Sequence, residues 1–164
     1  MGTGKLGRYL NTKGSGRSVS DFALVHSNEG TFTYSPKTGR ISKLKSGGHG
    51  QAGLEILKKQ GIAFNIVKTY PNGVRIGNIP SHKDPRKRVG TGMAWFPATW
   101  TEKDIRHAGE HVAGLRHNRR VSSGRTIWGV YKGVRVGVIR THGKIATVFP
   151  DNKQDSVTKR RKKK

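Results

Sequence analysis

Short stretches of alternating hydrophobic and polar residues fill the chain from residue 126 to residue 150. The three segments read TIWGVY, VRVGVIR and KIATVFP, and the pairs Lys132-Gly133 and His142-Gly143 separate them. Side chains of a strand point alternately to opposite faces, so this pattern predicts half-buried strands, and glycine-containing pairs are typical of tight turns. We therefore predict an antiparallel β-meander over residues 126–150.

The middle of the chain predicts two hairpins with a short helix between them. Residues 30–45 alternate Thr, Phe, Thr and Tyr before a turn that contains Pro36 and Gly39. Residues 51–61 carry leucines at helical spacing, which indicates a short helix. Residues 62–79 return to a period of two on either side of a Pro-Asn-Gly turn, as a second hairpin would.

A longer helix is predicted from residue 101. Thr101 and Asp104 have the spacing of a variant capping box, in which two side chains satisfy the first free backbone groups of a helix. An apolar stripe follows at intervals of three and four residues, formed by Ile105, Ala108, Val112 and Leu115. The prolines within residues 80–100 favour a loop there. The predicted fold class is α+β, with short helices and hairpins packed against a small antiparallel sheet.

The two ends of the chain differ from this apolar middle. Residues 1–29 are predicted to form a flexible basic leader, because the first twenty are mostly Gly, Ser, Lys and Arg. Residues 152–164 read NKQDSVTKRRKKK, and we predict a disordered basic tail without core-forming residues. The expected folded domain therefore covers residues 30–151.

The charge balance points to a polyanionic partner. Lys and Arg total 33 against 9 Asp and Glu, which gives a formal net charge of +24. Such a charge attracts nucleic acid or another anionic surface. The chain has no apolar run near the ~18 residues of a membrane span, its first residues lack a secretory signal, and it has no cysteine for disulfides or thiolate metal sites. We expect a cytoplasmic protein that binds nucleic acid and not a membrane.

A histidine in an unusual setting is the first candidate for chemistry. Residues 47–51 read GGHGQ, so glycines flank His49. Glycines permit close approach of a ligand or a backbone, and an exposed imidazole can move protons near neutral pH. A surface-loop histidine without a role is the alternative.

A second histidine lies in the basic stretch PSHKDPRKR, residues 80–88. Cleavage of RNA by acid–base chemistry requires a base for the 2′-OH, an acid for the 5′-oxygen and a cation near the phosphate. His82 could pair with His49 for the two proton transfers, while a neighbouring lysine supplies the cation. A basic RNA-binding loop in which His82 is incidental remains the other interpretation.

A third pair of histidines matches a zinc-peptidase pattern. Residues 107–111 read HAGEH, which is the H-x-x-E-H order of inverted zinc peptidases. The strongly basic chain is unlike a peptidase, and no carboxylate-bearing segment downstream resembles a third ligand. We reject this interpretation and expect neither a metal nor another cofactor.

The order of these motifs resembles the EndoU family of endoribonucleases, specifically the bacterial members found at the C-termini of polymorphic toxins. The resemblance covers residues 30–151 in four blocks: GGHGQ, NGVRIGNIPSHKDPRKR, GTGMAWFPATWTEKDI before a helix, and the meander that closes with GKIATVFP. Four blocks in this order are more specific than any one alone.

The resemblance implies a set of site residues. Family members use two histidines, a lysine, a hydroxyl residue and an aromatic residue near the end of the last strand. By resemblance these are the catalytic residues His49, His82 and Lys87, with Lys83 as an alternative to Lys87, and the substrate-binding residues Thr91, Thr147 and Phe149. Phe149 stands where the family commonly has Tyr, so it can stack on a base but cannot donate a hydrogen bond.

The resemblance also implies an activity. The chain is expected to be a metal-independent endoribonuclease that leaves 2′,3′-cyclic phosphate and 5′-OH ends, with His49 as base and His82 as acid or the reverse. The glycines around His49 are then expected to give an RNA phosphate room to reach its ring. Its target could be tRNA, and a toxin domain of this kind would require a cognate immunity protein. A non-catalytic RNA- or ribosome-binding protein is the alternative, because charge alone would suffice for that role.

Overall fold

In the computed structural model, which describes residues 16–157, the predicted meander forms a three-stranded antiparallel sheet. Its strands are β6 (Thr126–Tyr131), β7 (Val134–Thr141) and β8 (Lys144–Pro150), in that order across the sheet. The turn residues Lys132 and His142 have φ values of 49° and 52°, and each precedes a glycine with positive φ. Two successive positive φ values match the twist of a tight hairpin, so the turn prediction is confirmed.

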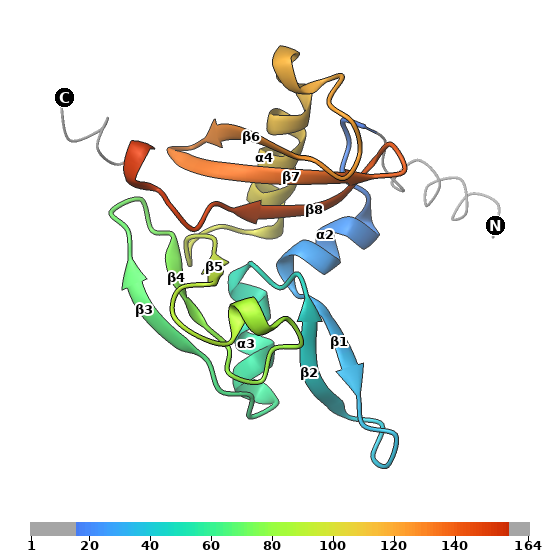
Figure 1. The fold of residues 1–164 in the computed structure, drawn as a ribbon, viewed down its shortest axis with the longest axis vertical. Helices are drawn as coiled ribbons and strands as arrows, with labels where there is room; N and C mark the ends of the chain where they lie inside the picture. Colours follow the sequence, from blue (N-terminus) through green and yellow to red (C-terminus); the bar gives the residue numbers. More distant parts are fainter. Residues whose placement is uncertain (1–15, 158–164) are drawn as a thin grey trace.

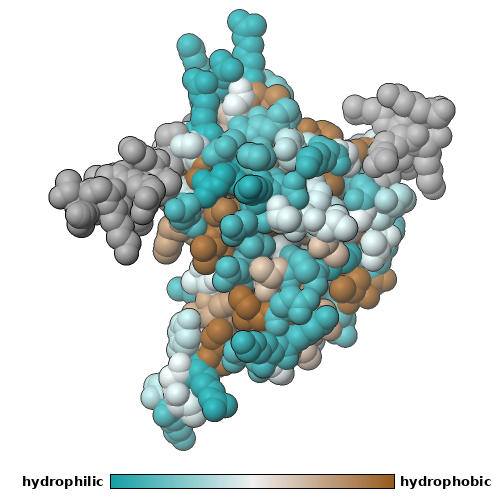
Figure 2. All heavy atoms as spheres, turned by 180° about the vertical axis from the view of Figure 1, so that it is seen from behind, coloured by the Kyte–Doolittle hydropathy of each residue, from teal (hydrophilic) through white to brown (hydrophobic). Residues whose placement is uncertain are grey.

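Helix α4 (Glu102–Gly114) packs against one face of this sheet (Figure 1). The capping box between Thr101 and Asp104 is present, with both reciprocal hydrogen bonds formed. The predicted stripe residues Ile105, Ala108 and Val112 are each fully buried. Hydrophilic side chains cover most of the molecule on the side seen from behind (Figure 2). The face of the sheet that α4 does not cover lines the cavity described below.

Helix α2 (Asp21–Asn28) belongs to the same core, although a leader was expected there. Ser20 caps the helix by accepting a hydrogen bond from the backbone N–H of Ala23. Val19, Ala23 and Leu24 are buried in the core beneath the meander, and α2 lies beside β8 (Figure 1). The folded region therefore begins before the predicted boundary at residue 30. The rest of the expected leader, residues 1–15, lies outside the described residues.

The remaining elements form two smaller antiparallel sheets and a helix. The first sheet pairs β1 (Thr31–Tyr34) with β2 (Ile41–Ser46), and helix α3 (Gln51–Lys59) follows. The second contains β3 (Asn65–Thr69), β4 (Arg75–Asn78) and β5 (Met93–Trp95), in that order. Both predicted hairpins and the short helix are confirmed, and so is the α+β class.

Strand β5 was not predicted, because residues 80–100 were expected to be mostly loop. Its three residues are too few to show a period, and pairing with β4 is what makes them a strand. Met93 and Trp95 are fully buried in a second core with residues from β2 and α3 and with Ile79, which directly follows β4. The chain thus has two halves: the meander with α2 and α4, and the two smaller sheets with α3.

The start of the predicted tail also packs on the folded chain. Gln154 is fully buried, and its side chain bonds to the backbone of Arg135 and to Asn72. Val157 is 8% exposed. The domain therefore continues past residue 151, while residues 158–164 of the expected tail lie outside the described residues. Within residues 16–157, each helix is too short or too polar to span a membrane.

Removal of residues 1–29 is expected to destabilise the protein. A chain that starts at residue 30 loses the buried side chains of Val19 and Leu24, which stabilise the fold by roughly 3–6 kcal/mol together. Urea unfolding should show this loss, whereas a chain that starts at residue 16 should keep these contacts and most of the stability. Equal free energies of unfolding for the two truncated chains would show that α2 is dispensable.

Candidate active site

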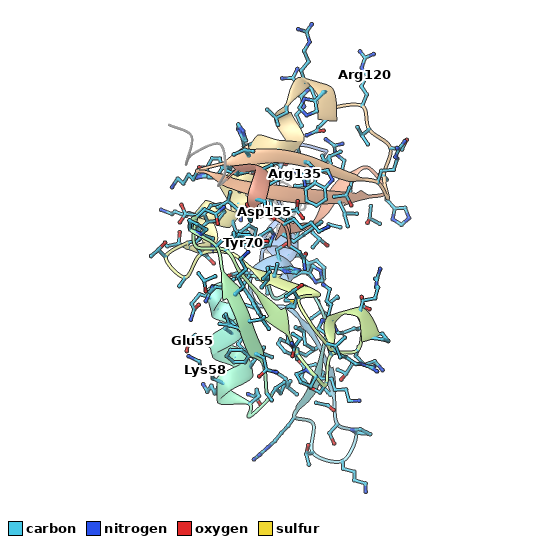
Figure 3. The ribbon with its side chains drawn as sticks, turned by 60° about the vertical axis from the view of Figure 1, so that its left-hand side comes forward. Glu55, Lys58, Tyr70, Arg120, Arg135 and Asp155 are labelled. Atoms are coloured by element: carbon cyan, nitrogen blue, oxygen red, sulfur yellow. The ribbon has the colours of Figure 1, made fainter. Side chains whose placement is uncertain are left out.

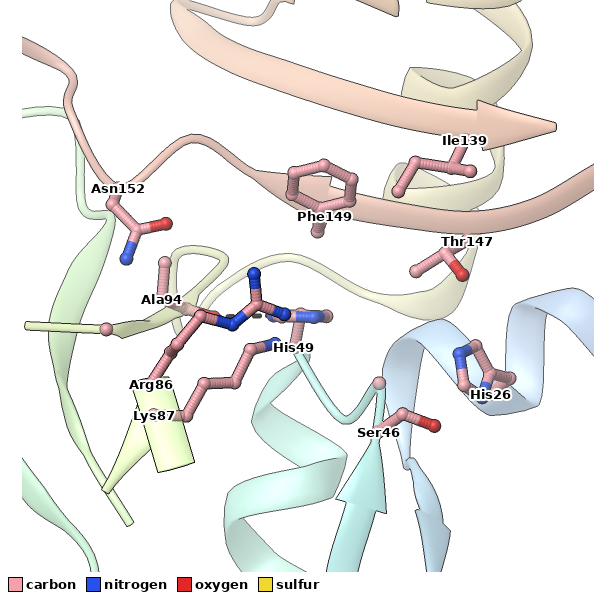
Figure 4. A pocket seen from close by; sticks show the side chains of 12 residues that line it. His26, Ser46, His49, Arg86, Lys87, Ala94, Ile139, Thr147, Phe149 and Asn152 are labelled. Atoms are coloured by element: carbon pink, nitrogen blue, oxygen red, sulfur yellow. Dashed lines mark hydrogen bonds between the residues drawn. The ribbon is translucent and has the colours of Figure 1, made fainter. Parts of the chain in front are cut away.

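A cavity of about 410 Å³ lies between the two halves of the fold (Figure 4). One side is formed by α2 and by the open face of β7 and β8, and the other by the end of β2, by the short 3₁₀ helix η1 (Pro85–Lys87) and by β5. The side chains around it are those of His26, Ser46, His49, Arg86, Lys87, Ala94, Ile139, Thr147, Phe149 and Asn152. Of the six site residues that the sequence predicts, four line this cavity and two do not.

The glycines around His49 bring two backbones together. Backbone N–H groups of Gly48, His49 and Gly50 donate to carbonyls in the last turn of α2, at 2.9, 2.6 and 3.1 Å. A Cβ on Gly47 would lie 2.1 Å from the carbonyl oxygen of His26, and one on Gly50 would lie 1.8 Å from a side-chain oxygen of Asn28. Only glycine fits such contacts. The glycines therefore serve the close approach to α2, and not the access of an RNA phosphate as predicted.

His49 is buried, contrary to the expected exposed imidazole, with 5% of its surface accessible. Its Nδ1 lies 2.7 Å from the carbonyl oxygen of Ala94, and its own carbonyl accepts from the N–H of Phe96. A carbonyl can only accept, so Nδ1 carries the proton and Nε2 of the neutral ring is free to accept one. Burial lowers the pKa of His49 well below its ordinary value, and the positive charge of Lys87 lowers it further.

His26 also lines the cavity, from the last turn of α2, and sequence reasoning missed it. Its Nδ1 lies 2.7 Å from the hydroxyl oxygen of Thr31. Burial lowers its pKa, with a further contribution from Lys87. The pairing of 47–50 with α2 places this ring next to Gly47. The sequence signal that could have located it is Ser20, because serine is favoured at helix N-termini. A helix that begins there would carry His26 in its last turn.

His82 is not brought to the cavity. Its ring is 1% exposed, and its Nδ1 accepts from the backbone N–H of Asp84 at 2.8 Å. Nε2 has no hydrogen-bond partner among residues 16–157. Burial, then the charge of Lys87, lowers the pKa of His82 to about 4, so the ring is neutral at physiological pH. In this position His82 stabilises the loop that leads into η1.

Lys87 projects from η1 toward His49 (Figure 4). Its side chain is half-buried, and among residues 16–157 no carboxylate lies within ion-pair distance of it. Burial lowers the pKa of Lys87, and the charge of Asp84 partly opposes this. Lys83, the alternative, is exposed and does not line the cavity. The cavity therefore holds an unpaired cation beside two histidines.

A second cation at the rim was not predicted. Arg86 lines the cavity and forms an ion pair with Asp84 at 2.8 Å. The hydrogen bonds from Arg86 lower the pKa of Asp84 to about 2, so this carboxylate stays charged. The pair fixes the direction of the guanidinium at the entrance, where it adds positive charge for an anionic ligand.

Thr147 and Phe149 lie on β8 and line the cavity, because residues two apart in a strand share a face. The ring of Phe149 is 5.9 Å from that of His49, between centroids. Thr91 is exposed and does not line the cavity; its carbonyl accepts from the side-chain amide of Asn152 at 2.6 Å. Asn152 and Ser46, which the sequence did not indicate, supply polar groups instead.

The histidines of HAGEH lie away from this site. His107 and His111 are exposed on α4, and the ring of His111 is 5.5 Å from that of Tyr131. Among the described residues no three His, Asp or Glu side chains are grouped so that they could hold a metal ion.

Two histidines and a lysine around one cavity of a strongly basic protein are the groups that a nuclease with acid–base chemistry needs. Residues 25–152 match the family model described as bacterial EndoU nuclease, and the chain belongs to this family. It is an EndoU-like nuclease, and its family implies RNA as the substrate. The matched region begins within α2 and includes His26. Neither the curated proteins nor the solved structures give a significant match.

Gly47→Ala is expected to damage this site, with Gly39→Ala as a matched control. Both glycines have a φ near +70°, but a Cβ at Gly39 would meet no atom within 4 Å. The control should lose about 1–2 kcal/mol from backbone strain alone. Gly47→Ala should lose a further ~1–3 kcal/mol, because its methyl group would contact the backbone of α2.

Urea unfolding measures both variants, and cleavage of one RNA under the same conditions measures their activity. Only Gly47→Ala should lose activity in its folded form, because it separates His26 from His49. Equal losses of stability in the two variants would contradict the role given to this close approach.

Proposed function

We propose that the chain cleaves RNA by transesterification, with His26 and His49 as the acid–base pair. The 2′-oxygen attacks the adjacent phosphorus, the bond to the 5′-oxygen breaks, and the products carry a 2′,3′-cyclic phosphate and a 5′-OH. The observation that carries this proposal is that both rings and Lys87 line the same cavity. No step of this mechanism uses a metal ion.

His49 suits the role of general base. Its Nδ1 proton is held by Ala94, which leaves Nε2 as the acceptor for the 2′-OH proton. Burial and Lys87 keep the ring neutral, as a base must be before it acts. The low pKa weakens the base, but the ring is already deprotonated in nearly every molecule at neutral pH.

His26 suits the role of general acid in place of His82. A productive site needs a deprotonated base together with a protonated acid, and this state is best populated when the base has the lower pKa. The pKa of His49 is lowered more strongly than that of His26, which is only half-buried. His26 can therefore protonate the departing 5′-oxygen while His49 accepts the 2′-OH proton.

Lys87 would stabilise the negative charge that develops on the phosphorane. A preformed cation in a partly desolvated site is more effective than one in water. Arg86 would add charge at the entrance, Thr147 would position the phosphate or ribose, and Phe149 would stack on a base. The substrate binding expected of Thr91 would instead come from Ser46 and Asn152, because their side chains face the cavity.

The finer biological role rests on the resemblance to polymorphic toxins. We propose that this is a toxin domain that acts on RNA in the cytoplasm, with tRNA as a candidate target. A cognate immunity protein would then be needed, and an acidic surface would suit it, because opposite charge speeds association and favours the correct partner.

Substitution of the three histidines tests the assignment. His26→Ala and His49→Ala should each lower kcat by roughly 10²–10⁴ with the fold retained, since both would transfer protons. His82→Asn should keep most of the activity, because its side-chain oxygen can still accept from Asp84. Assays in EDTA, with mass spectrometry of the RNA ends, measure both rate and product.

If a normally folded His82→Asn lost as much activity as His49→Ala, His82 and not His26 would be the general acid. Ends other than 2′,3′-cyclic phosphate and 5′-OH, or an activity that EDTA removes, would contradict the acid–base mechanism itself.

The pH dependence of kcat/KM tests the effect of Lys87 on the two rings. The profile should be bell-shaped with its maximum below pH 6.5, because the pKa values of His26 and His49 are both lowered. In Lys87→Met both limbs should move to higher pH, since the lysine charge lowers both pKa values, while the maximal rate falls. Limbs that stay in place would show that Lys87 does not act on the histidines.

A further inference from the structure

A second hollow, of about 390 Å³, lies beside strand β6. It shares no lining residue with the cavity that holds His49. The 3₁₀ helix η2 (Arg116–Asn118), the loop after it and β6 surround this hollow. Arg120, Arg125 and Trp128 are among the residues that line it.

The hollow is strongly basic. Residues 116–125 read RHNRRVSSGR, with four arginines and no acidic residue. Arg120 and Arg125 are exposed, and among residues 16–157 no carboxylate lies within ion-pair distance of either. Arg120 projects from one end of the molecule (Figure 3). Unpaired guanidinium groups around a concave surface are suited to phosphate groups of a nucleic acid.

Aromatic side chains connect this hollow to the cavity. Trp128 lines the hollow, Phe149 lines the cavity, and their ring centroids are 5.7 Å apart in an edge-to-face contact. Both rings lie over Gly137 of β7, where a Cβ would come within 2.7 Å of Phe149 and 2.8 Å of Trp128. The missing side chain lets the two rings meet across the central strand.

The sheet face that carries these rings is opposite to α4. Arg135 also lies on it, with its guanidinium 4.2 Å from the centre of the Trp128 ring and in an ion pair with Asp151. Planar aromatic and guanidinium groups on an open sheet are surfaces on which unpaired bases stack. A path of such groups therefore leads from Phe149 in the cavity to the arginines of the hollow.

We propose that the hollow is a second binding site for the substrate, which holds a single-stranded RNA segment flanking the cleaved bond. Trp128 and Arg135 contact its bases, and Arg120 and Arg125 contact its phosphates. This inference rests on the proposed function, since it assigns the hollow to the same RNA that is cleaved in the cavity. A second site of this kind would make longer RNA bind more tightly than a dinucleotide.

The test compares a dinucleotide, which occupies the cavity alone, with a single-stranded RNA of about 12 nucleotides, a length within the range that such grooves bind. The variant is Arg120→Ala/Arg125→Ala. Lys58→Ala/Lys59→Ala removes the same formal charge from exposed residues of α3, and Lys58 lies far from Arg120, in the other half of the molecule (Figure 3).

The arginine variant should raise KM for the longer RNA at unchanged kcat, because it removes binding common to the ground and transition states. Dinucleotide cleavage should stay unchanged. The plot of log Kd against log salt should flatten by about 0.7 per lost phosphate contact, or about 1.4 for two. The lysine variant should show neither effect. An Arg120→Lys/Arg125→Lys variant should restore most of the binding.

Equal effects of the arginine and lysine variants would overturn the proposal, and so would equal losses on the two substrates or none on either. Binding of a 12-nucleotide RNA with 2′-O-methyl groups, measured by fluorescence anisotropy, separates this result from the fate of the proposed mechanism. Weaker binding only in the arginine variant supports the second site even if the wild-type protein cleaves neither RNA.

Discussion

The hydrogen bonds between residues 48–50 and the last turn of α2 are the interaction on which the site depends. They place two histidines, 23 positions apart in the chain, beside one cavity. The backbone of residues 47–50 must lie very close to α2 for these bonds to form. This requires glycine at positions 47 and 50, where a Cβ atom would overlap with α2. The need for glycine here is geometric, and the position of His49 beside the cavity follows from it.

Electrostatics then sets the protonation states of the site. Burial and Lys87 act in the same direction on His26, His49 and His82, so all three favour the neutral ring. Among residues 16–157, the Lys and Arg side chains that line the cavity are Lys87 and Arg86. An anionic substrate would offset the field of Lys87 on binding and so raise the histidine pKa values, which would assist the proton transfers proposed for His26 and His49.

Local sequence patterns predicted the elements that local forces determine. The meander turns at Lys132 and His142 and the capping box at Thr101 require only neighbouring residues, and each was predicted. Helix α2 and strand β5 are short and depend on packing against distant segments, so their own residues gave no clear period. The candidate site was predicted only in part for the same reason. The family resemblance indicated Lys87, Thr147 and Phe149, whereas His26 lies in α2, where a flexible leader was expected.

His49 is tied to both halves of the protein. Its backbone N–H bonds to α2 in one half, while its ring bonds to Ala94 of β5 and its carbonyl to Phe96, the residue after β5. A molecule that changed the angle between α2 and β5 would therefore turn this ring. An inhibitor that acted in this way from outside the cavity would not need to compete with RNA for it.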